Sequence, residues 1–294
     1  MKLATFNVKD LFDPGFGAKL DELARHVRRA RADVLALNEV GSEEALDGLV
    51  ARVADAVDYK HRIVGKPDKR GIRNVILSRH PLAASREHHR SSLPFPGLHD
   101  GDPPPFGDRI PLRRAIPEAR VMAPFGEVAI FAAHFKSKRG VGPKDAGGAE
   151  RDPVTPAERA AADVRSLVLR AAEALFVREL VDAALATTPF VAVLGDLNDV
   201  PDSVPLRVLC RCGEGALVSA AEVVPHDARV SALHGGHRSQ IDHILLSPAL
   251  RARVTDAGFL NEELRDHGPV PADDAPPTVD SDHALFWATV ADEA

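Results

Sequence analysis

FVAVLGDLND, residues 190–199, is a short apolar run followed at once by polar turn formers. Its length and its β-branched content are typical of a buried strand over residues 190–194, and Gly195 and Asp196 mark the turn that ends it. The predicted strand delivers Asp196, Asn198 and Asp199 to the edge of a sheet. Loops leave a sheet at its edge, and functional sites are commonly built there.

A second polar group of this kind lies near the C-terminus. Ser281, Asp282 and His283 lead directly into residues 284–290, which we predict to be the last strand. Asp242 stands near the start of another predicted strand, residues 240–246. An acid and an imidazole so late in the chain complete a site only if polar groups from earlier segments converge on them.

The opening of the chain predicts a strand-helix-strand-helix order. Alternation places Leu3, Thr5 and Asn7 on one face of a strand, and residues 34–38 form a short buried strand that ends at Glu39. After each of these strands, apolar residues recur at helical spacing and predict a helix. The second predicted helix begins after Ser42, which can cap it. The apolar positions of the two predicted helices are Leu20, Leu23, Ala24 and Val27, then Leu46, Leu49, Val50 and Val53.

The middle of the chain combines strands, a long loop and a long helix. Residues 61–64, 74–78 and 128–138 are predicted strands, and the last of these places His134, Lys136 and Lys138 on one face near its end. Residues 86–117 are rich in Pro, Gly, His and Asp and predict a long irregular segment that decides the substrate.

The long helix is predicted to begin at a capping box, Thr155 to Glu158 with Pro156 at the first helical position, and to run to about Ala186. Ser203 is expected to start a short helix. The expected buried face of the long helix is Val164, Leu167, Val168, Ala171 and Leu175.

Composition restricts the class of protein. With 294 residues, 45% of them hydrophobic and 27% charged, the chain is expected to form one globular domain over residues 1–294. No apolar run approaches the roughly 18 residues of a membrane span, and no signal peptide is seen, so we expect a cytoplasmic monomer with no evident protein partner.

Two cysteines, Cys210 and Cys212, exclude a disulfide framework. The formal charge of −6 makes any nucleic-acid contact local.

These polar residues suggest phosphoester hydrolysis. Glu39 best fits the oxygen ligands that Mg²⁺ prefers. Asp196 is placed to take or orient the proton of an attacking water molecule, and Asn198 and His134 are placed to donate hydrogen bonds to phosphate oxygens. His283 is an acid-base group or a phosphate ligand, and Asp242 can fix its tautomer. Each motif is weak alone, since turn residues and a structural histidine are common, so the prediction rests on their shared position near strand ends.

The ordered motifs resemble the endonuclease/exonuclease/phosphatase superfamily, which has the deoxyribonuclease-I-like fold, over nearly the full chain. The motifs that carry the resemblance are Thr5-Phe6-Asn7-Val8, Leu37-Asn38-Glu39-Val40, the segment from Arg73 and Asn74 to Pro81, His134-Phe135-Lys136-Ser137-Lys138, Gly195-Asp196-Leu197-Asn198-Asp199, Ile241-Asp242-His243 and Ser281-Asp282-His283. The resemblance implies an α/β (α+β) four-layer sandwich, in which two packed mixed β-sheets are flanked by helices and the site lies at one rim.

The resemblance also implies residue roles. Glu39 would bind the metal with Asn7 and Asp282 close by, Asp196 and Asn198 would serve the nucleophile and the phosphate, and Asp242 would orient His283. We assign substrate or phosphate binding to Arg73, Asn74, Lys136 and Lys138. Two departures from the family pattern are Asn38, where glutamine is common, and the pair Ala132 and Ala133, where an asparagine often stands.

Three functions stay open at this point. The leading one is a Mg²⁺-dependent phosphodiesterase, with Mn²⁺ as the alternative ion, that acts as a nuclease on DNA. The second is a phosphatase or phosphodiesterase acting on a small phosphorylated metabolite or a lipid headgroup, favoured by the acidic net charge and an aromatic content of 5%. The third is a binding protein that retains the fold without the chemistry.

Overall fold

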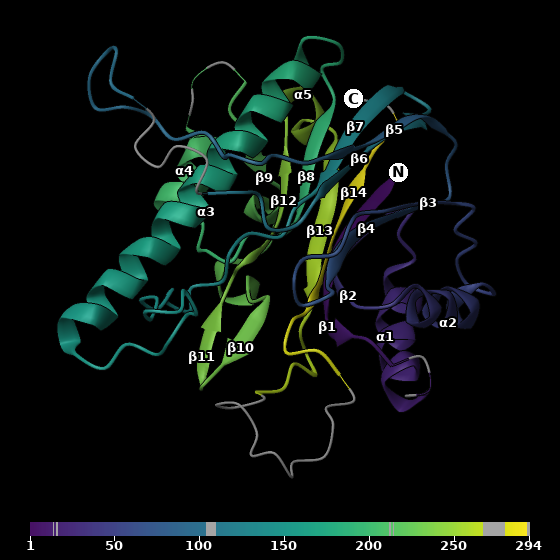
Figure 1. Ribbon diagram of the computed structural model, residues 1–294. Helices are drawn as coiled ribbons and strands as arrows, with labels where there is room; N and C mark the ends of the chain where they lie inside the picture. The colour runs from purple at the N-terminus through teal and green to yellow at the C-terminus, as the bar shows by residue number, and fades with distance from the viewer. Residues whose placement is uncertain are drawn as a thin grey trace.

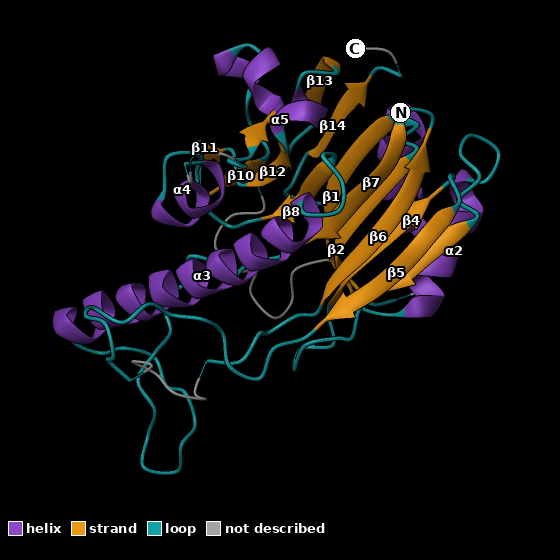
Figure 2. Cartoon of the chain, turned by 90° about the horizontal axis from the view of Figure 1, so that it is seen from above, coloured by secondary structure: helices purple, strands orange, loops and turns teal. Residues whose placement is uncertain are grey.

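Two six-stranded sheets pack face to face in the computed structural model, and helices cover their outer faces (Figures 1 and 2). The structure describes residues 1–13, 15, 17–103, 110–211, 213, 215–266 and 280–292. Cys212 and residues 104–109 of the predicted long loop lie outside the described residues.

The first sheet joins the two ends of the chain. Its strands, in spatial order, are β13 (Val254–Leu260), β14 (Leu285–Val290), β1 (Lys2–Leu11), β2 (Val34–Val40), β4 (Arg73–Ser78) and β3 (His61–Val64). β1 runs parallel to β2 and antiparallel to β14. Helices α1 (Gly17–Ala30) and α2 (Glu43–Val53) pack on its outer face through one apolar cluster that includes Phe6, Leu23 and Leu46.

The second sheet carries the long helix. Its strands, in spatial order, are β5 (Leu82–His88), β6 (Ile116–Ala123), β7 (Gly126–Ala132), β8 (Val191–Asp196), β12 (Asp242–Leu246) and β9 (Val218–Ser219). Helices α3 (Pro156–Leu185) and α4 (Val204–Cys210) pack on its outer face through a cluster that includes Phe131, Val177 and Leu206. The remaining elements are the hairpin β10 (Ala232–His234) and β11 (His237–Ser239), α5 (Pro248–Arg251) and the short 3₁₀ turns Ala220–Val223 and His226–Ala228.

A third apolar cluster fills the space between the sheets, and it includes Leu3, Ile130, Leu194 and Phe286. Helices, sheet, sheet and helices therefore form the four layers that the resemblance implies. The alternation predicted for β7 is confirmed, because Ile130 and Ala132 face the other sheet while Ala129 and Phe131 face α3.

Both predicted helix caps are present. The Ser42 side chain accepts a hydrogen bond from the Ala45 amide, and Thr155 and Glu158 form a complete capping box. The long helix is continuous over its 30 residues.

Several predicted boundaries are wrong. β7 ends at Ala132, so His134, Lys136 and Lys138 follow the strand rather than continue it. The predicted loop over residues 86–117 contains the end of β5 and the start of β6. β5 was missed because it is a largely exposed strand at the end of its sheet without an apolar alternation, and β6 because its second residue is Pro117.

The predicted buried face of the long helix is also wrong, because none of its five residues is among the buried residues of α3. Val164 and Leu167 are 59% and 38% exposed. Small and polar residues occupy the buried side instead, namely Ala162, Ser166, Arg170 and Glu173. This part of the helix packs against loop backbone, which polar side chains can satisfy, rather than against the apolar face of the sheet.

Across the residues that the structure describes, every helix is too short or too polar to cross a membrane.

Candidate active site

Strand register brings polar residues together at one rim of the sandwich. Asn7 lies opposite Asn38 in the parallel pair β1 and β2, and Asp196 lies opposite Asp242 in the antiparallel pair β8 and β12. Because the two sheets face each other, these positions meet across the interface. The Asn7 Nδ2 donates to Asp196 Oδ2 at 3.0 Å and to Glu39 Oε1 at 3.3 Å.

Asn38 connects the sheets behind these acids. Its Oδ1 accepts a hydrogen bond from the Asp196 amide at 2.9 Å, and its Nδ2 donates to Asn74 Oδ1 at 2.9 Å. Asn74 in turn donates to the Ala115 carbonyl. Asn38 and Asn74 are both fully buried. In this structure Asn74 therefore supports the site from behind rather than facing solvent.

Gly195 allows β8 to approach the end of β7. Its φ is +147°, and a Cβ atom there would stand 1.8 Å from the Ala133 carbonyl oxygen. Only glycine fits so close a backbone contact. This contact places Asp196 next to the segment that carries His134.

Backbone strain is concentrated at the same rim. Among the described residues, five non-glycine residues have positive φ, and four of them, Lys9, Asp10, Glu39 and Asn198, belong to this region. The φ values of Glu39 and Asn198 are +64° and +54°. Such conformations cost free energy and persist where the surrounding contacts enforce them. Glu39 is held by Asn7 and by the Asp10 amide, and Asn198 by Asp196 and the Phe135 carbonyl.

Asp242 is buried and forms an ion pair with the partly buried His283. Asp242 Oδ2 lies 2.8 Å from His283 Nδ1, and Asp196 Oδ2 lies 4.0 Å from His283 Nε2. Burial by itself lowers the pKa of His283, but the Asp242 and Asp196 carboxylates outweigh it and raise the pKa to about 10. The imidazole is therefore cationic at neutral pH. Burial, reinforced by the Asp242 charge, raises the pKa of Asp196 to about 7.

His134 and Glu39 complete the centre. His134 Nε2 lies 3.5 Å from Asp196 Oδ2 and 3.9 Å from Glu39 Oε1. Burial, together with the nearby Arg114 charge, lowers the pKa of His134 well below its usual range, so its imidazole is neutral. Burial and the Asp10 charge raise the pKa of Glu39.

Asp282 lies beside the centre and has cationic neighbours. Its Oδ2 is 2.7 Å from Lys9 Nζ and 3.4 Å from His234 Nδ1. Ser281 donates to the Asn7 carbonyl and accepts from the His283 amide, which ties the C-terminal segment to β1.

The predicted substrate-binding cations lie further from the centre. Arg73 contacts Glu43 and the Gly41 carbonyl, and the buried Lys136 directs its ammonium to the Ser137 and Arg139 carbonyls. Lys138 is half-exposed and pairs with Asp199 at 3.2 Å.

Sequence reasoning missed three charged residues at the rim. Lys9 contacts Asp282, and Arg70 pairs with Asp10 at 2.7 Å while its charge acts on both Glu39 and His134. Arg70 lies within the turn-like residues 65–71, and Lys9 and Asp10 stand near the end of β1, so no pattern distinguished them from ordinary surface charges.

The described residues contain two groups whose donor atoms could surround a cation. One is Asp196, Asp242 and His283, whose donor atoms lie within 4.8 Å of one another. With Glu39 nearby, the rim offers the carboxylate oxygens that hard divalent cations prefer. The pKa values of Asp196 and Glu39 are raised by burial, so a bound cation would stabilise their charged forms.

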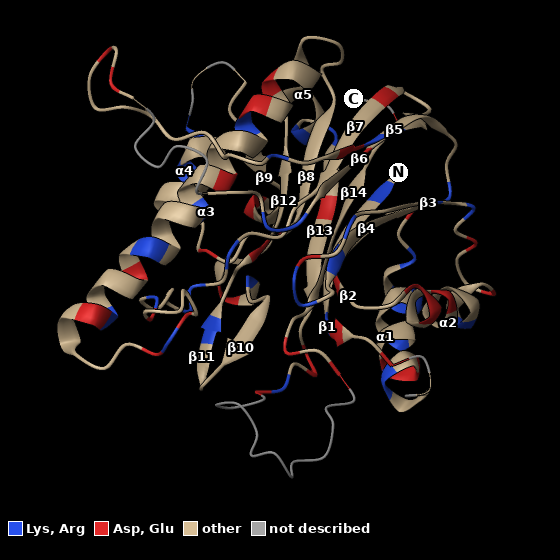
Figure 3. Ribbon diagram, in the orientation of Figure 1, with Lys and Arg blue, Asp and Glu red and all other residues tan. Residues whose placement is uncertain are grey.

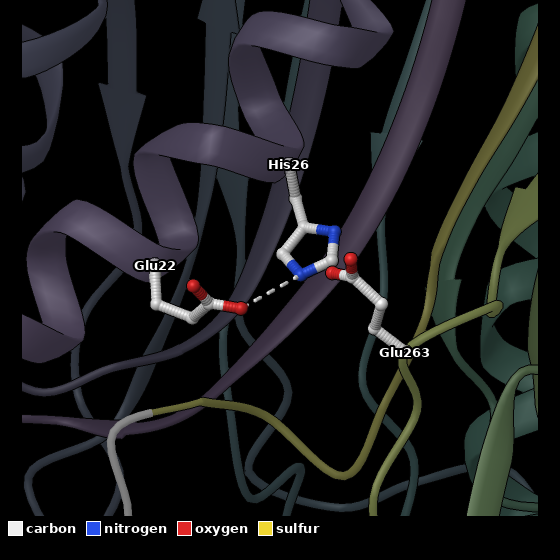
Figure 4. A group of neighbouring side chains, drawn as sticks. All are labelled: Glu22, His26 and Glu263. Atoms are coloured by element: carbon white, nitrogen blue, oxygen red, sulfur yellow. Dashed lines mark ion pairs between the residues drawn. The ribbon is translucent and has the colours of Figure 1, made fainter.

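The second group is Glu22, His26 and Glu263, away from the rim. Figure 4 shows Glu22 and His26 on one face of α1, with Glu263 facing them from the segment after β13. Arg25 forms ion pairs with both glutamates, so its guanidinium already balances their charge. This group is explained as an ion-pair network that holds the segment after β13 against α1.

The two-sheet sandwich and its rim of acids, amides and imidazoles define a hydrolase of the phosphoesterase class. The chain belongs to the Endonuclease/Exonuclease/phosphatase family, whose model matches residues 4–283. Members of this family are divalent-metal-dependent hydrolases of phosphoester bonds and include nucleases and phosphatases.

Solved structures share the fold at low sequence identity. Truncated TDP2 from Caenorhabditis elegans has a TM-score of 0.62 at 14% identity, covering 98% of this chain and 95% of that one. The 3′ phosphatase NExo from Neisseria, bound to a product DNA hairpin, has a TM-score of 0.61 at 19% identity, covering 99% of both chains. A mannosyl-6-phosphatase from Bacteroides thetaiotaomicron has a TM-score of 0.61 at 16% identity, covering 99% of both chains. No curated protein sequence matches the chain significantly.

Proposed function

We propose that the chain is a nuclease that hydrolyses phosphodiester bonds in DNA with Mg²⁺ bound, Mn²⁺ being the alternative ion. The observation that carries the proposal is the meeting of Glu39, Asp196, His134 and the Asp242–His283 pair at one rim. Acid, neutral imidazole and cationic imidazole are groups that serve phosphoester hydrolysis. Here His134 lies 3.5 Å from Asp196 and 3.9 Å from Glu39, and His283 lies 4.0 Å from Asp196.

The metal is proposed to bind at Glu39, with Asn7 and Asp282 beside it. A divalent cation bound there supplies Lewis-acid stabilisation of the charge on a phosphoryl oxygen. The Asn7 amide holds Glu39 and Asp196 together across the sheets, so it fixes the spacing of the two carboxylates. Lys9 neutralises Asp282 in the metal-free chain and would compete for this carboxylate.

The remaining residues act on the water and the phosphate. Asp196, with a pKa of about 7, can accept a proton from an attacking water near neutral pH. The cationic His283, fixed by Asp242, stabilises the negative charge that grows on the phosphate during attack. Asn198 and the neutral His134 offer N–H donors to phosphate oxygens. The Asn198 Nδ2 donates to the Phe135 carbonyl at 3.0 Å and to Asp196 Oδ2 at 3.1 Å, so a bound phosphate oxygen would replace Asp196 Oδ2 as its acceptor.

The charge distribution around the rim supports a nucleic-acid substrate. Exposed cations stand on the loops before β4, before β6 and after β7, and Figure 3 shows basic residues along the loops between α3 and β2. These cations are Lys69, Arg70, Arg113, Lys138 and Arg139. Backbone phosphates beyond the scissile one would contact such residues. The structural neighbour NExo holds a product DNA hairpin, which is consistent with this reading.

A small phosphorylated substrate is the second candidate, because the opposite side of the rim is acidic. Asp266, Asp280 and Asp282 lie in the segments between β13 and β14. A long polyanion crossing the whole rim would meet these charges, whereas a short phosphoester would not. The mannosyl-6-phosphatase neighbour illustrates such a substrate on the same fold.

A substrate panel separates the two candidates. Wild type and Glu39→Gln are assayed with Mg²⁺ or Mn²⁺ on labelled single- and double-stranded DNA, sugar phosphates, inositol phosphates and sphingomyelin. DNA cleavage that Glu39→Gln abolishes supports the nuclease. Turnover of a small ester without DNA cleavage supports the second candidate, and no turnover of any member contradicts both. We further propose that residues 1–294 act as one domain, since strands from both chain ends share one sheet.

A further inference from the structure

The middle of α3 turns polar side chains toward the rim loops. Ser166, Arg170 and Glu173 follow one another at helical spacing and are 0%, 6% and 2% exposed. In Figure 1 the N-terminal part of α3 extends beyond the strands, beside the loops that leave their rim. Further along α3 the buried side is largely apolar and includes Val177, Val181 and Ala184. The buried polar residues before them therefore require an explanation.

Arg170 connects two loops that carry site residues. Its Nε donates to Asp199 Oδ2 at 3.0 Å, and its Nη1 donates to the Ser137 carbonyl at 3.1 Å. Asp199 directly follows Asn198, and Ser137 lies three positions after His134. One guanidinium thus joins the segment after β8 to the segment after β7.

Ser166 and Glu173 extend the same contact. Ser166 Oγ donates to the Ser137 carbonyl at 2.8 Å and accepts from Arg170 Nη1 at 2.7 Å. The Glu173 carboxylate accepts a hydrogen bond from the Lys136 amide at 2.7 Å. Side chains from successive turns of α3 therefore hydrogen-bond to the backbone that follows His134.

This arrangement is costly for stability alone. Buried charged pairs lose much of their attraction to desolvation, and apolar packing is often as stable. Asn198 also has a left-handed φ of +54°, which must be imposed by its surroundings. The Arg170 contact to Asp199 adds to the hydrogen bonds of Asn198 with Asp196 and the Phe135 carbonyl, because it fixes the residue that follows Asn198.

We propose that Arg170 is a positioning residue for phosphoester hydrolysis, which sets Asn198 through Asp199 and His134 through the Ser137 carbonyl. This inference rests on the proposed function of the rim. It assigns Arg170 no contact with the substrate. Its loss should displace the phosphate donors while leaving substrate affinity largely intact.

The test compares Arg170→Met with Arg178→Met. Arg178 lies on the same helix, is equally buried at 6% exposure, and contacts Asp182 and the Gly215 carbonyl, away from the rim. Both substitutions remove a buried guanidinium from α3, so a general loss of stability affects both. Arg170→Met is expected to lower kcat roughly 10–100-fold, as for other residues that orient a site from behind, with KM changed less than about threefold. Arg178→Met should keep kcat within about threefold of wild type.

Further measurements keep the outcome interpretable. Arg170→Lys retains the charge and should recover part of kcat, as should millimolar guanidinium added to Arg170→Met. In metal-free protein, the Asn198 amide signals in NMR spectra should shift in Arg170→Met and stay in place in Arg178→Met. If Arg170→Met does not fold, Ser166→Ala provides the comparison, because it removes a hydrogen bond to Arg170 and one to the Ser137 carbonyl.

Two results would overturn the proposal. One is Arg170→Met with kcat within twofold of wild type and unshifted Asn198 signals. The other is an equal loss of kcat in Arg178→Met, which would show a merely structural role. An inactive wild type would contradict the function of the rim instead, and the NMR comparison would still decide whether Arg170 positions Asn198.

Discussion

Replacing Asp242 by asparagine tests the electrostatic part of the site. The substitution keeps the shape of the side chain and removes the charge that lies 2.8 Å from His283 Nδ1. Burial, which lowers the pKa of His283, is then opposed chiefly by Asp196, so we expect the pKa to fall from about 10 by roughly 2 units or more. NMR titration of the His283 ring in metal-free protein measures this. Asp202→Asn, an equal charge change at an 88% exposed side chain, is the control and should leave the titration unchanged.

The same substitution should change stability in a pH-dependent way. Because the folded-state pKa is raised above 6.5, protonation of His283 stabilises the fold fully below about pH 6.5, and this contribution is lost as the pH rises through about 10. At 1.36 kcal/mol per pKa unit the contribution is about 5 kcal/mol at pH 6 and about half of that at pH 8. Urea unfolding of both proteins should therefore differ by about 3–5 kcal/mol at pH 6 and much less at pH 9.5. An equal difference at both pH values, or a His283 midpoint that stays above 9 in Asp242→Asn, would show that Asp242 does not raise the pKa of His283.

Three further substitutions test the packing around the site. Gly195→Ala places a Cβ 1.8 Å from a backbone carbonyl oxygen, so it should lower kcat and destabilise the fold. Gly148→Ala is the control, because Gly148 also has positive φ but has open space around it. Urea unfolding should show a loss of stability about 1–3 kcal/mol larger for Gly195→Ala, and equal losses would contradict the clash. Asn38→Ala leaves buried hydrogen-bonding partners unsatisfied and should cost about 2–3 kcal/mol, so an unchanged unfolding midpoint would be inconsistent with its bridging role. Val164→Ser should change stability by less than about 0.5 kcal/mol, because the Val164 side chain is 59% exposed; a loss above about 1.5 kcal/mol would mean that it is buried.

Local sequence patterns predicted the elements whose signal lies within the element itself. Alternation in β1 and β7 and the capping residues Ser42 and Thr155 were read correctly, because each depends on neighbours a few positions away. The resemblance then supplied the arrangement of the elements into four layers. Periodicity alone gave no means of pairing β1 with both β2 and β14.

Elements whose burial depends on distant segments were missed. β5 is mostly exposed and reads as a polar loop, and the first half of α3 buries Arg170 rather than Val164 because the backbone of other loops lies against it. In the same way, the sequence pointed to Glu39 and His283 as candidates but could not reveal that Arg70 or Lys9 lies beside them. The partners of Lys136 likewise depend on where the chain turns after β7.

The proposed activity depends most on Glu39 acting with a divalent cation at the rim. The direct measurement is the rate of phosphoester cleavage by wild type and by Glu39→Gln, each with Mg²⁺, with Mn²⁺ and with EDTA, on the best substrate of the panel. We predict that EDTA abolishes cleavage by wild type and that Glu39→Gln is slower by on the order of 100-fold with either ion. Cleavage by Glu39→Gln at the wild-type rate, or wild-type cleavage that persists in EDTA, would contradict the account.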